Sequence, residues 1–205
     1  IVTFHHHFKD NNGDLCLVME YCSGGNLRNK LKNKHPLNQI VDWLKQLTSV
    51  LHFVHQHGIV HHDIKPENIL FDSDNTIKLG DFGVYNTNSG TWPYMAPEPM
   101  DTKDARVDVY ALGITLLEMW AGYNPFFGIG YRDSLQAKIL HDFIPKNLPG
   151  WQQEILLKAT HPKPELSFQT MADFQEAVEA HHVPFIFDKR QIEAHVLAEK
   201  SENML

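Results

Sequence analysis

Three oxygen-bearing side chains and one lysine form the clearest chemical signal in this sequence. Asp63 and Asn68 stand five residues apart in the polar run HHDIKPENIL, and Asp81 follows a short apolar segment. Carboxylate and amide oxygens are the hard ligands that Mg²⁺ prefers. Lys65 can neutralise negative charge on a phosphoryl group that is being transferred. One base, two metal ligands and a cation suit phosphoryl transfer, in which catalysis is mostly positioning and electrostatics.

The flanking sequence predicts the elements that position these side chains. Apolar residues spaced four and three apart indicate one face of a helix: Ile40, Leu44, Leu47, Leu51 and Val54. Residues 59–60 and 69–71 bracket the polar loop, and residues 77–79 predict a short strand before Gly80. Residues 107–120, apolar on nearly all sides, predict a helix buried in the middle of the domain. Further helices are expected near residues 133–142, 151–160 and 168–181.

The front of the chain has a different pattern. Residues 1–20 alternate loosely around the turn sequence NNGD, which predicts two paired strands, and SGGN at 23–26 ends the second strand. The fold class is therefore mainly α with small β elements. The charged segment after Pro184 permits either a packing helix or a linker, and the sequence leaves both open.

Size and charge exclude several functional classes. The 205 residues fit one domain, and the net charge of −7 comes with scattered Lys and Arg rather than a basic stripe. That argues against a nucleic-acid partner and against a membrane surface. No apolar run approaches the roughly 20 residues of a membrane span. Cys16 and Cys22 are expected to be free thiols.

Three motifs together resemble those of eukaryotic-type Ser/Thr protein kinases. HHDIKPEN is similar to the catalytic loop H-R-D-x-K-P-x-N, DFG at 81–83 to the metal-binding motif, and APE at 96–98 to the end of the activation segment. The resemblance extends to about residue 180 and implies a protein-kinase-like fold. It divides the chain into remnant N-lobe strands and hinge (1–22), a C-lobe (23–184) and a C-terminal tail or linker (185–205).

The resemblance also implies a role for each motif residue. Asp63 would orient the substrate hydroxyl and accept its proton, and Lys65 would contact the γ-phosphate of ATP. Asn68 and Asp81 would hold Mg²⁺. Thr91, in the run GTWPYMAPE, matches the threonine that bonds the Asp and Lys of the catalytic loop. The lysine two places after the aspartate is the Ser/Thr-type arrangement.

Other matching positions concern the frame and the nucleotide. Asp108 resembles the buried carboxylate that holds the catalytic-loop backbone from the central helix. The run LVMEYCSGGNL resembles the hinge, with Met19 at the gatekeeper position. There the backbones of Glu20 and Cys22 would face the adenine edge, and Asn26 would lie near the ribose.

The sequence departs from the family pattern at three places. No G-x-G-x-x-G-x-V loop or V-A-I-K lysine precedes the hinge; both normally cover the phosphates, so an upstream N-lobe segment or a partner is expected to complete the ATP site. His62 replaces an arginine, and histidine is a weaker, pH-dependent partner for phosphate. Glu98 lacks its usual arginine because Glu165 or Leu166 stands there, and Arg106 is a candidate replacement.

Two groups of side chains have an ordinary structural interpretation. The fourteen histidines invite a metal site, but no Cys or acidic residue stands nearby at zinc-ligand spacing; His61 is expected to pack the catalytic loop. Trp120, Phe126 and Phe127 are expected to pack in the core at a helix end rather than to form a docking surface.

The leading hypothesis is a Ser/Thr protein kinase, truncated here, that transfers the γ-phosphoryl group of ATP to Ser or Thr of a protein substrate in the cytoplasm. The alternative is a catalytically inactive kinase-like scaffold or allosteric module. A small-molecule kinase of related fold ranks last, because the APE segment and the GTW run serve as a platform for an extended peptide.

Overall fold

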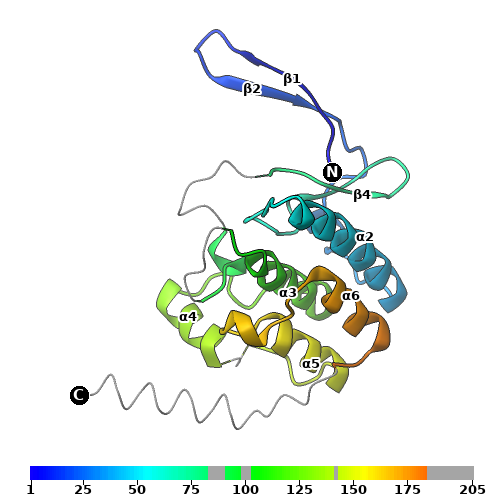
Figure 1. Ribbon diagram of the computed structural model, residues 1–205, viewed down its shortest axis with the longest axis vertical. Helices are drawn as coiled ribbons and strands as arrows, with labels where there is room; N and C mark the ends of the chain where they lie inside the picture. The colour runs from blue at the N-terminus through cyan, green and yellow to red at the C-terminus, as the bar shows by residue number, and fades with distance from the viewer. Residues whose placement is uncertain (83–90, 98–102, 141–142, 184–205) are drawn as a thin grey trace, which may run out of the picture.

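A computed structural model describes residues 1–82, 91–97, 103–140 and 143–183, and consists of a helical body with a β-hairpin rising from it (Figure 1). The helices in chain order are α1 Leu27–Lys30, α2 Leu37–Gln56, α3 Arg106–Ala121, α4 Tyr131–Leu140, α5 Gly150–Ala159 and α6 Met171–Ala180, with 3-10 turns η1 Trp92–Tyr94 and η2 Pro164–Leu166. The strands are β1 Phe4–Lys9, β2 Leu15–Met19, β3 Ile69–Phe71 and β4 Ile77–Leu79. The prediction of a mainly helical fold with small β elements is confirmed.

The predicted pair of strands at the front is the hairpin β1–β2, which stands away from the helices in Figure 1. Its turn forms because the Asp10 carboxylate accepts hydrogen bonds from the backbone of Asn12 (2.8 Å) and Asp14 (2.9 Å). At its base the Val2 N–H donates to the Leu79 carbonyl (2.9 Å). The hairpin is therefore tied to β4 rather than to the helices.

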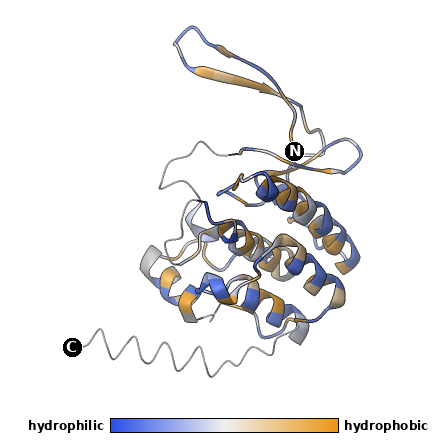
Figure 2. Cartoon of the chain, viewed as in Figure 1, coloured by the Kyte–Doolittle hydropathy of each residue, from blue (hydrophilic) through white to orange (hydrophobic). Residues whose placement is uncertain are grey.

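Helix α2 buries the face that its apolar spacing predicts. All five residues at that spacing are buried, and the helix packs against α6, α3 and β4. Hydrophobic and hydrophilic residues alternate around it in Figure 2, as expected of an amphipathic helix. Trp43, on the same helix, meets the Phe71 ring edge-on with centroids 5.3 Å apart, which joins α2 to β3.

Helix α3 is the centre of the body and is buried on all sides from Asp108 to Met119, as its continuous apolar sequence predicts. It packs against α5 and η1. Gly113 permits the close approach to α5, because a Cβ there would stand 2.9 Å from the Cβ of Ala159. The helix ends at Gly122, whose φ of 82° is left-handed and whose N–H donates to the Glu118 carbonyl.

Two features differ from the expectation. The segment after SGGN forms the one-turn helix α1, capped by the Asn26 side chain, because Leu27 is drawn completely into the core. Phe126 is fully buried as predicted, but Phe127 is 50% exposed, so its assignment to the core is wrong. Residues 185–205 lie outside the described residues, and with them the choice between helix and linker. Among the residues described, no helix combines the length and apolarity that crossing a bilayer requires.

Candidate active site

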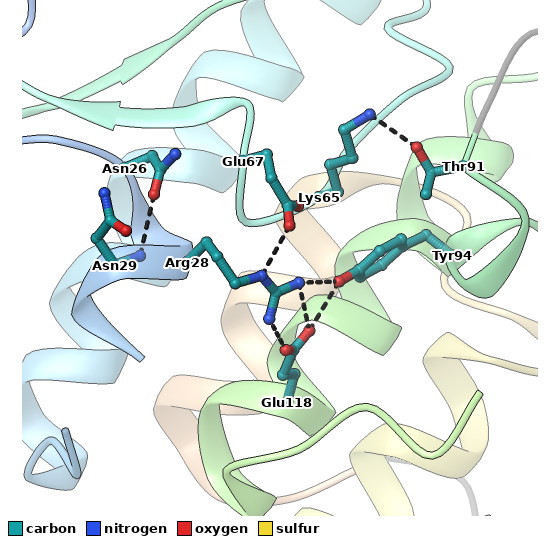
Figure 3. A network of polar contacts seen from close by, with 8 residues as sticks. All are labelled: Asn26, Arg28, Asn29, Lys65, Glu67, Thr91, Tyr94 and Glu118. Atoms are coloured by element: carbon teal, nitrogen blue, oxygen red, sulfur yellow. Dashed lines mark hydrogen bonds and ion pairs between the residues drawn. The ribbon is translucent and has the colours of Figure 1, made fainter. Parts of the chain in front are cut away.

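The Asp63 carboxylate is the centre of a closed hydrogen-bond network. Lys65 Nζ donates to its Oδ2 (2.5 Å), and Asn68 Nδ2 donates to the same oxygen (3.0 Å) and to the Asp63 carbonyl (2.8 Å). Oδ1 accepts from both the backbone N–H (3.0 Å) and the hydroxyl (2.8 Å) of Thr91. Lys65 also donates to the Thr91 hydroxyl oxygen at 2.7 Å, a bond visible in Figure 3.

These bonds set the charge of Asp63. Burial alone would raise its pKa, but the hydrogen bonds from Lys65, Thr91 and Asn68 outweigh burial and hold the pKa below the usual range of an aspartate. The group is therefore ionised at neutral pH. An ionised carboxylate fixed by three neighbours can accept the hydrogen of an incoming hydroxyl in one defined direction, which is a positioning role more than that of a strong base.

The backbone before Asp63 is held from α3. Asp108 is completely buried, and its two oxygens accept the N–H groups of His61 (2.8 Å) and His62 (2.9 Å). His55, on α2, bonds the same carboxylate at 2.8 Å. His62 adopts a left-handed φ of 67°, which costs a non-glycine residue about 1–2 kcal/mol. The structure therefore matches the expectation that Asp108 holds this loop, and it adds His55.

His61 links the loop to the segment that carries Asp81. It is buried, and burial lowers its pKa, so the ring is neutral. Its Nε2 lies 2.9 Å from the Gly80 carbonyl and its Nδ1 accepts from the Asp63 N–H (3.3 Å), which assigns the proton to Nε2. The ring also packs on Phe82, with centroids 4.6 Å apart. The expected packing role of His61 is confirmed.

Asn68 and Asp81 offer oxygens suited to Mg²⁺. Because the amide nitrogen of Asn68 donates to Asp63, its carbonyl oxygen is left as the available ligand. The Gly80 N–H donates to the backbone carbonyl of Asn68 (3.0 Å), and Asp81 is the next residue, with an exposed side chain. Within the described ranges, no group of three or more His, Cys, Asp and Glu side chains could hold a metal. Mg²⁺ fits this donor set, since it commonly takes one or two protein oxygens plus phosphates and water.

The residues expected at the nucleotide, Glu20, Cys22 and Asn26, lie beside β3 and β4. The Glu20 carboxylate pairs with Lys78 (2.9 Å) on β4 and accepts from the Thr3 N–H (3.0 Å). Gly24 lies so close to Phe71 that a Cβ would stand 2.8 Å from its carbonyl oxygen. The Cys22 carbonyl accepts from Gly25 (3.3 Å).

Asn26 has a structural task of its own. Its side-chain oxygen accepts from the Asn29 N–H (3.0 Å) as the cap of α1, so part of this side chain is already engaged. Met19, the expected gatekeeper, is 48% exposed at the end of β2.

An ionic network around the buried Glu118 was not predicted from the sequence, and its Arg28 and Glu67 side chains are 28% and 40% exposed. The Arg28 guanidinium binds both oxygens of Glu118, the Tyr94 hydroxyl (2.5 Å) and Glu67 Oε1 (2.7 Å), as Figure 3 shows. Tyr94 in turn donates to Glu118 (2.8 Å). Four segments thus meet at one guanidinium: α1, the loop after Lys65, η1 and α3. Burial, together with Glu118, raises the pKa of Tyr94, so its hydroxyl stays protonated.

Glu98 lies outside the described residues, and with it the expectation about its ion-pair partner. Arg106, the candidate partner, pairs with Asp104 (2.7 Å) and also donates to Gln169 (3.1 Å). Residue 83 of the DFG motif and the segment 83–90 are likewise not described. The structure thus brings Asp63, Lys65, Asn68 and Thr91 into direct contact, sets Asp81 next to them along the backbone, and leaves Glu20, Cys22 and Asn26 along β3–β4.

Comparison with known proteins gives a consistent result. The sequence profile of the Protein kinase domain matches residues 1–176. A probable serine/threonine-protein kinase of Clostridium acetobutylicum is 32% identical over 173 residues, covering 75% of this chain and 26% of that protein. Serine/threonine-protein kinase PknB of Mycobacterium leprae is 32% identical over 184 residues (78% and 29%), and an Aurora kinase of Candida glabrata 37% over 139 residues (62% and 38%). The chain thus spans well under half the length of these relatives.

Proposed function

We propose, from the premise that this chain belongs to the protein kinase domain family, that it carries the catalytic half of a Ser/Thr protein kinase. The reaction would move the γ-phosphoryl group of ATP to a Ser or Thr hydroxyl of a protein substrate. The observation that carries the proposal is the Asp63 carboxylate, bound at once by Lys65, Asn68 and Thr91. An inert scaffold has no physical need of such a constellation.

Each residue has a task in this proposal. Asp63 orients the substrate hydroxyl and receives its proton while the oxygen attacks the γ-phosphorus. Lys65, held at 2.5 Å from Asp63, offers positive charge to the transferring group. Asn68 and Asp81 would hold Mg²⁺, which neutralises phosphate charge when bound. Thr91 would couple the peptide platform to the catalytic loop through its two bonds to Asp63.

The nucleotide side of the proposal concerns Glu20, Cys22 and Asn26. Backbone groups of the first two would meet the adenine edge, and the Asn26 amide nitrogen would meet the ribose. We propose that an upstream N-lobe segment or a partner covers the phosphates. Because the reaction consumes ATP, we assign it to the cytoplasm.

The test is phosphoryl transfer from labelled ATP with Mg²⁺ to a generic Ser/Thr protein substrate, using the full-length protein that contains this chain. Asp63→Asn should lower the rate by about a hundredfold or more. Asp74→Asn is the matched control, because Asp74 is exposed in the β3–β4 turn. If both variants kept the wild-type rate, the proposal would be wrong. Calorimetry of nucleotide binding adds a second measurement, since a pure scaffold should show no Mg²⁺-dependent nucleotide affinity.

A further inference from the structure

Lys138 is a buried lysine beneath the turn that follows Thr91. It lies on α4, only 3% of it is exposed, and its Nζ donates hydrogen bonds to the backbone carbonyls of Trp92 (2.8 Å) and Met95 (2.7 Å). Trp92 is the first residue of η1, and Met95 is the residue that follows its last residue, Tyr94. One ammonium group therefore fastens both ends of the turn.

The surroundings of Lys138 are apolar, which makes its charge costly. The ring centroids of Phe126, Trp92 and Tyr110 lie 4.7, 5.7 and 6.0 Å from Nζ. The Tyr110 hydroxyl of α3 is the one titratable group on these rings, and burial raises its pKa, so it is uncharged. Burial also lowers the pKa of Lys138 to about 7. An apolar residue of similar length would avoid this desolvation, so stability alone gives no reason for a lysine here.

The turn that Lys138 holds leads directly into the Asp63 network. The Tyr94 N–H donates to the Thr91 carbonyl (2.8 Å), so η1 and Thr91 form one hydrogen-bonded unit. Thr91 in turn presents its N–H and hydroxyl to Asp63 and its hydroxyl oxygen to Lys65. A shift of about 1 Å in such a group can cost a hundredfold in rate.

We propose that Lys138 is a positioning residue for the phosphoryl-transfer site, because it fixes η1 at both ends and thereby aligns Thr91 with Asp63 and Lys65. This inference rests on the proposed function. Charge-assisted bonds from an ammonium are roughly twice as strong as neutral ones. Below about pH 7, where Lys138 carries its charge, this group bonded to two carbonyls therefore secures the turn more firmly than a neutral side chain would.

The test compares Lys138→Met with a matched control, Lys158→Met. Lys158, on α5, also holds its Nζ over an aromatic ring, but that ring is Phe168, 4.8 Å away at its centroid, and not a residue of η1. The first readout is hydrogen exchange of the amides of residues 91–96. The second, with the full-length protein, is kcat/KM for the protein substrate beside KM for ATP.

We expect Lys138→Met to speed exchange in residues 91–96 and to lower kcat/KM for the protein substrate, each by about tenfold. KM for ATP should stay as in wild type, and the unfolding midpoint should not fall. Lys158→Met should change neither readout. Wild-type exchange in Lys138→Met would overturn the inference, as would a parallel loss of ATP binding and stability. If Lys138→Met fails to fold, Lys138→Gln, which is too short to reach both carbonyls, replaces it, and wild-type exchange there would again overturn the inference. Hydrogen exchange tests the role of Lys138 in holding η1 even if no phosphoryl transfer is found. The absence of transfer would reject the proposed function separately.

Discussion

Replacing Glu118 by glutamine should destabilise the protein by about 3 kcal/mol or more. Glu118 is 3% exposed, and its carboxylate accepts hydrogen bonds from Arg28 and from the Tyr94 hydroxyl. Glutamine keeps the size but removes the charge, and its amide nitrogen would face one of these donors. Removing one partner of a buried ion pair costs about 3–5 kcal/mol. Glu67, 2.7 Å from Arg28, still compensates part of the guanidinium charge, which places the expected value near the lower end.

The assay is urea unfolding at pH 7, with Glu179→Gln as the matched control. Glu179 pairs with Lys45 at 3.5 Å on the surface, where both side chains are at least 40% exposed. Such pairs contribute about 0–1 kcal/mol. With a urea m-value of about 2–3 kcal/mol/M, Glu118→Gln should lower the midpoint by about 1 M or more, whereas Glu179→Gln should barely move it.

Equal midpoints for the two variants would refute the reasoning. They would mean that the Arg28 guanidinium finds full compensation without Glu118. A lowered midpoint with a changed m-value would point to altered unfolded or native compactness rather than to the lost ion pair.

Three further outcomes follow from the site and its surroundings. Thr91→Val keeps the backbone bond to Asp63 but loses the hydroxyl, so kcat should fall about a hundredfold while Thr91→Ser keeps most of it; equal kinetics for valine and serine would contradict this. The pKa of Lys138 falls from 10.5 to about 7 on folding, so the folded state binds fewer protons above pH 7 and stability rises with pH there. In urea unfolding, the free energy of unfolding of wild type should therefore rise relative to that of Lys138→Met by about 1 kcal/mol per pH unit between pH 7.5 and 9. The same pH dependence in both proteins would contradict this. The hydrogen bond from Lys78, and to a smaller extent that from Thr3, lowers the pKa of Glu20 to about 2. The contact therefore stabilises the folded state above pH 4.5, and this stabilisation is lost as the pH falls toward 2. In Lys78→Gln, the NMR titration midpoint of Glu20 should rise toward 4.5, and a midpoint still near 2 would exclude Lys78 as the main cause.

Local pattern accounts for the parts of the fold that could be predicted. Helix α2 has a regular apolar face, and α3 is apolar on nearly all sides. The helical conformation and the buried residues of each can therefore be predicted from a short stretch of sequence. Asp63, Lys65 and Asn68 lie within six residues of one loop, so their proximity follows from the chain itself. The short helix α1 has too few residues for a periodic signal, and it forms because tertiary packing buries Leu27.

The contacts that the sequence could not predict join distant charges. Arg28 and Glu118 are 90 residues apart, and each looks like an ordinary surface charge in the sequence. Lys138 is one of several charged residues in a helix with no pronounced apolar face, and only the packed structure turns it beneath Trp92 and Met95. The sequence also does not distinguish Phe126 from its neighbour Phe127, although Phe126 is fully buried and Phe127 is 50% exposed.

The hydrogen bonds from the loop before Asp63 to Asp108 have a consequence for folding during synthesis. His61 and His62 precede Asp108 by 47 and 46 residues, so a growing chain that has left the ribosome only as far as residue 100 has nothing to secure them. His62 would relax from its left-handed conformation until α3 emerges and packs. The backbone before Asp63 therefore gains its bonds to Asp108 only after α3 has been synthesised and has packed.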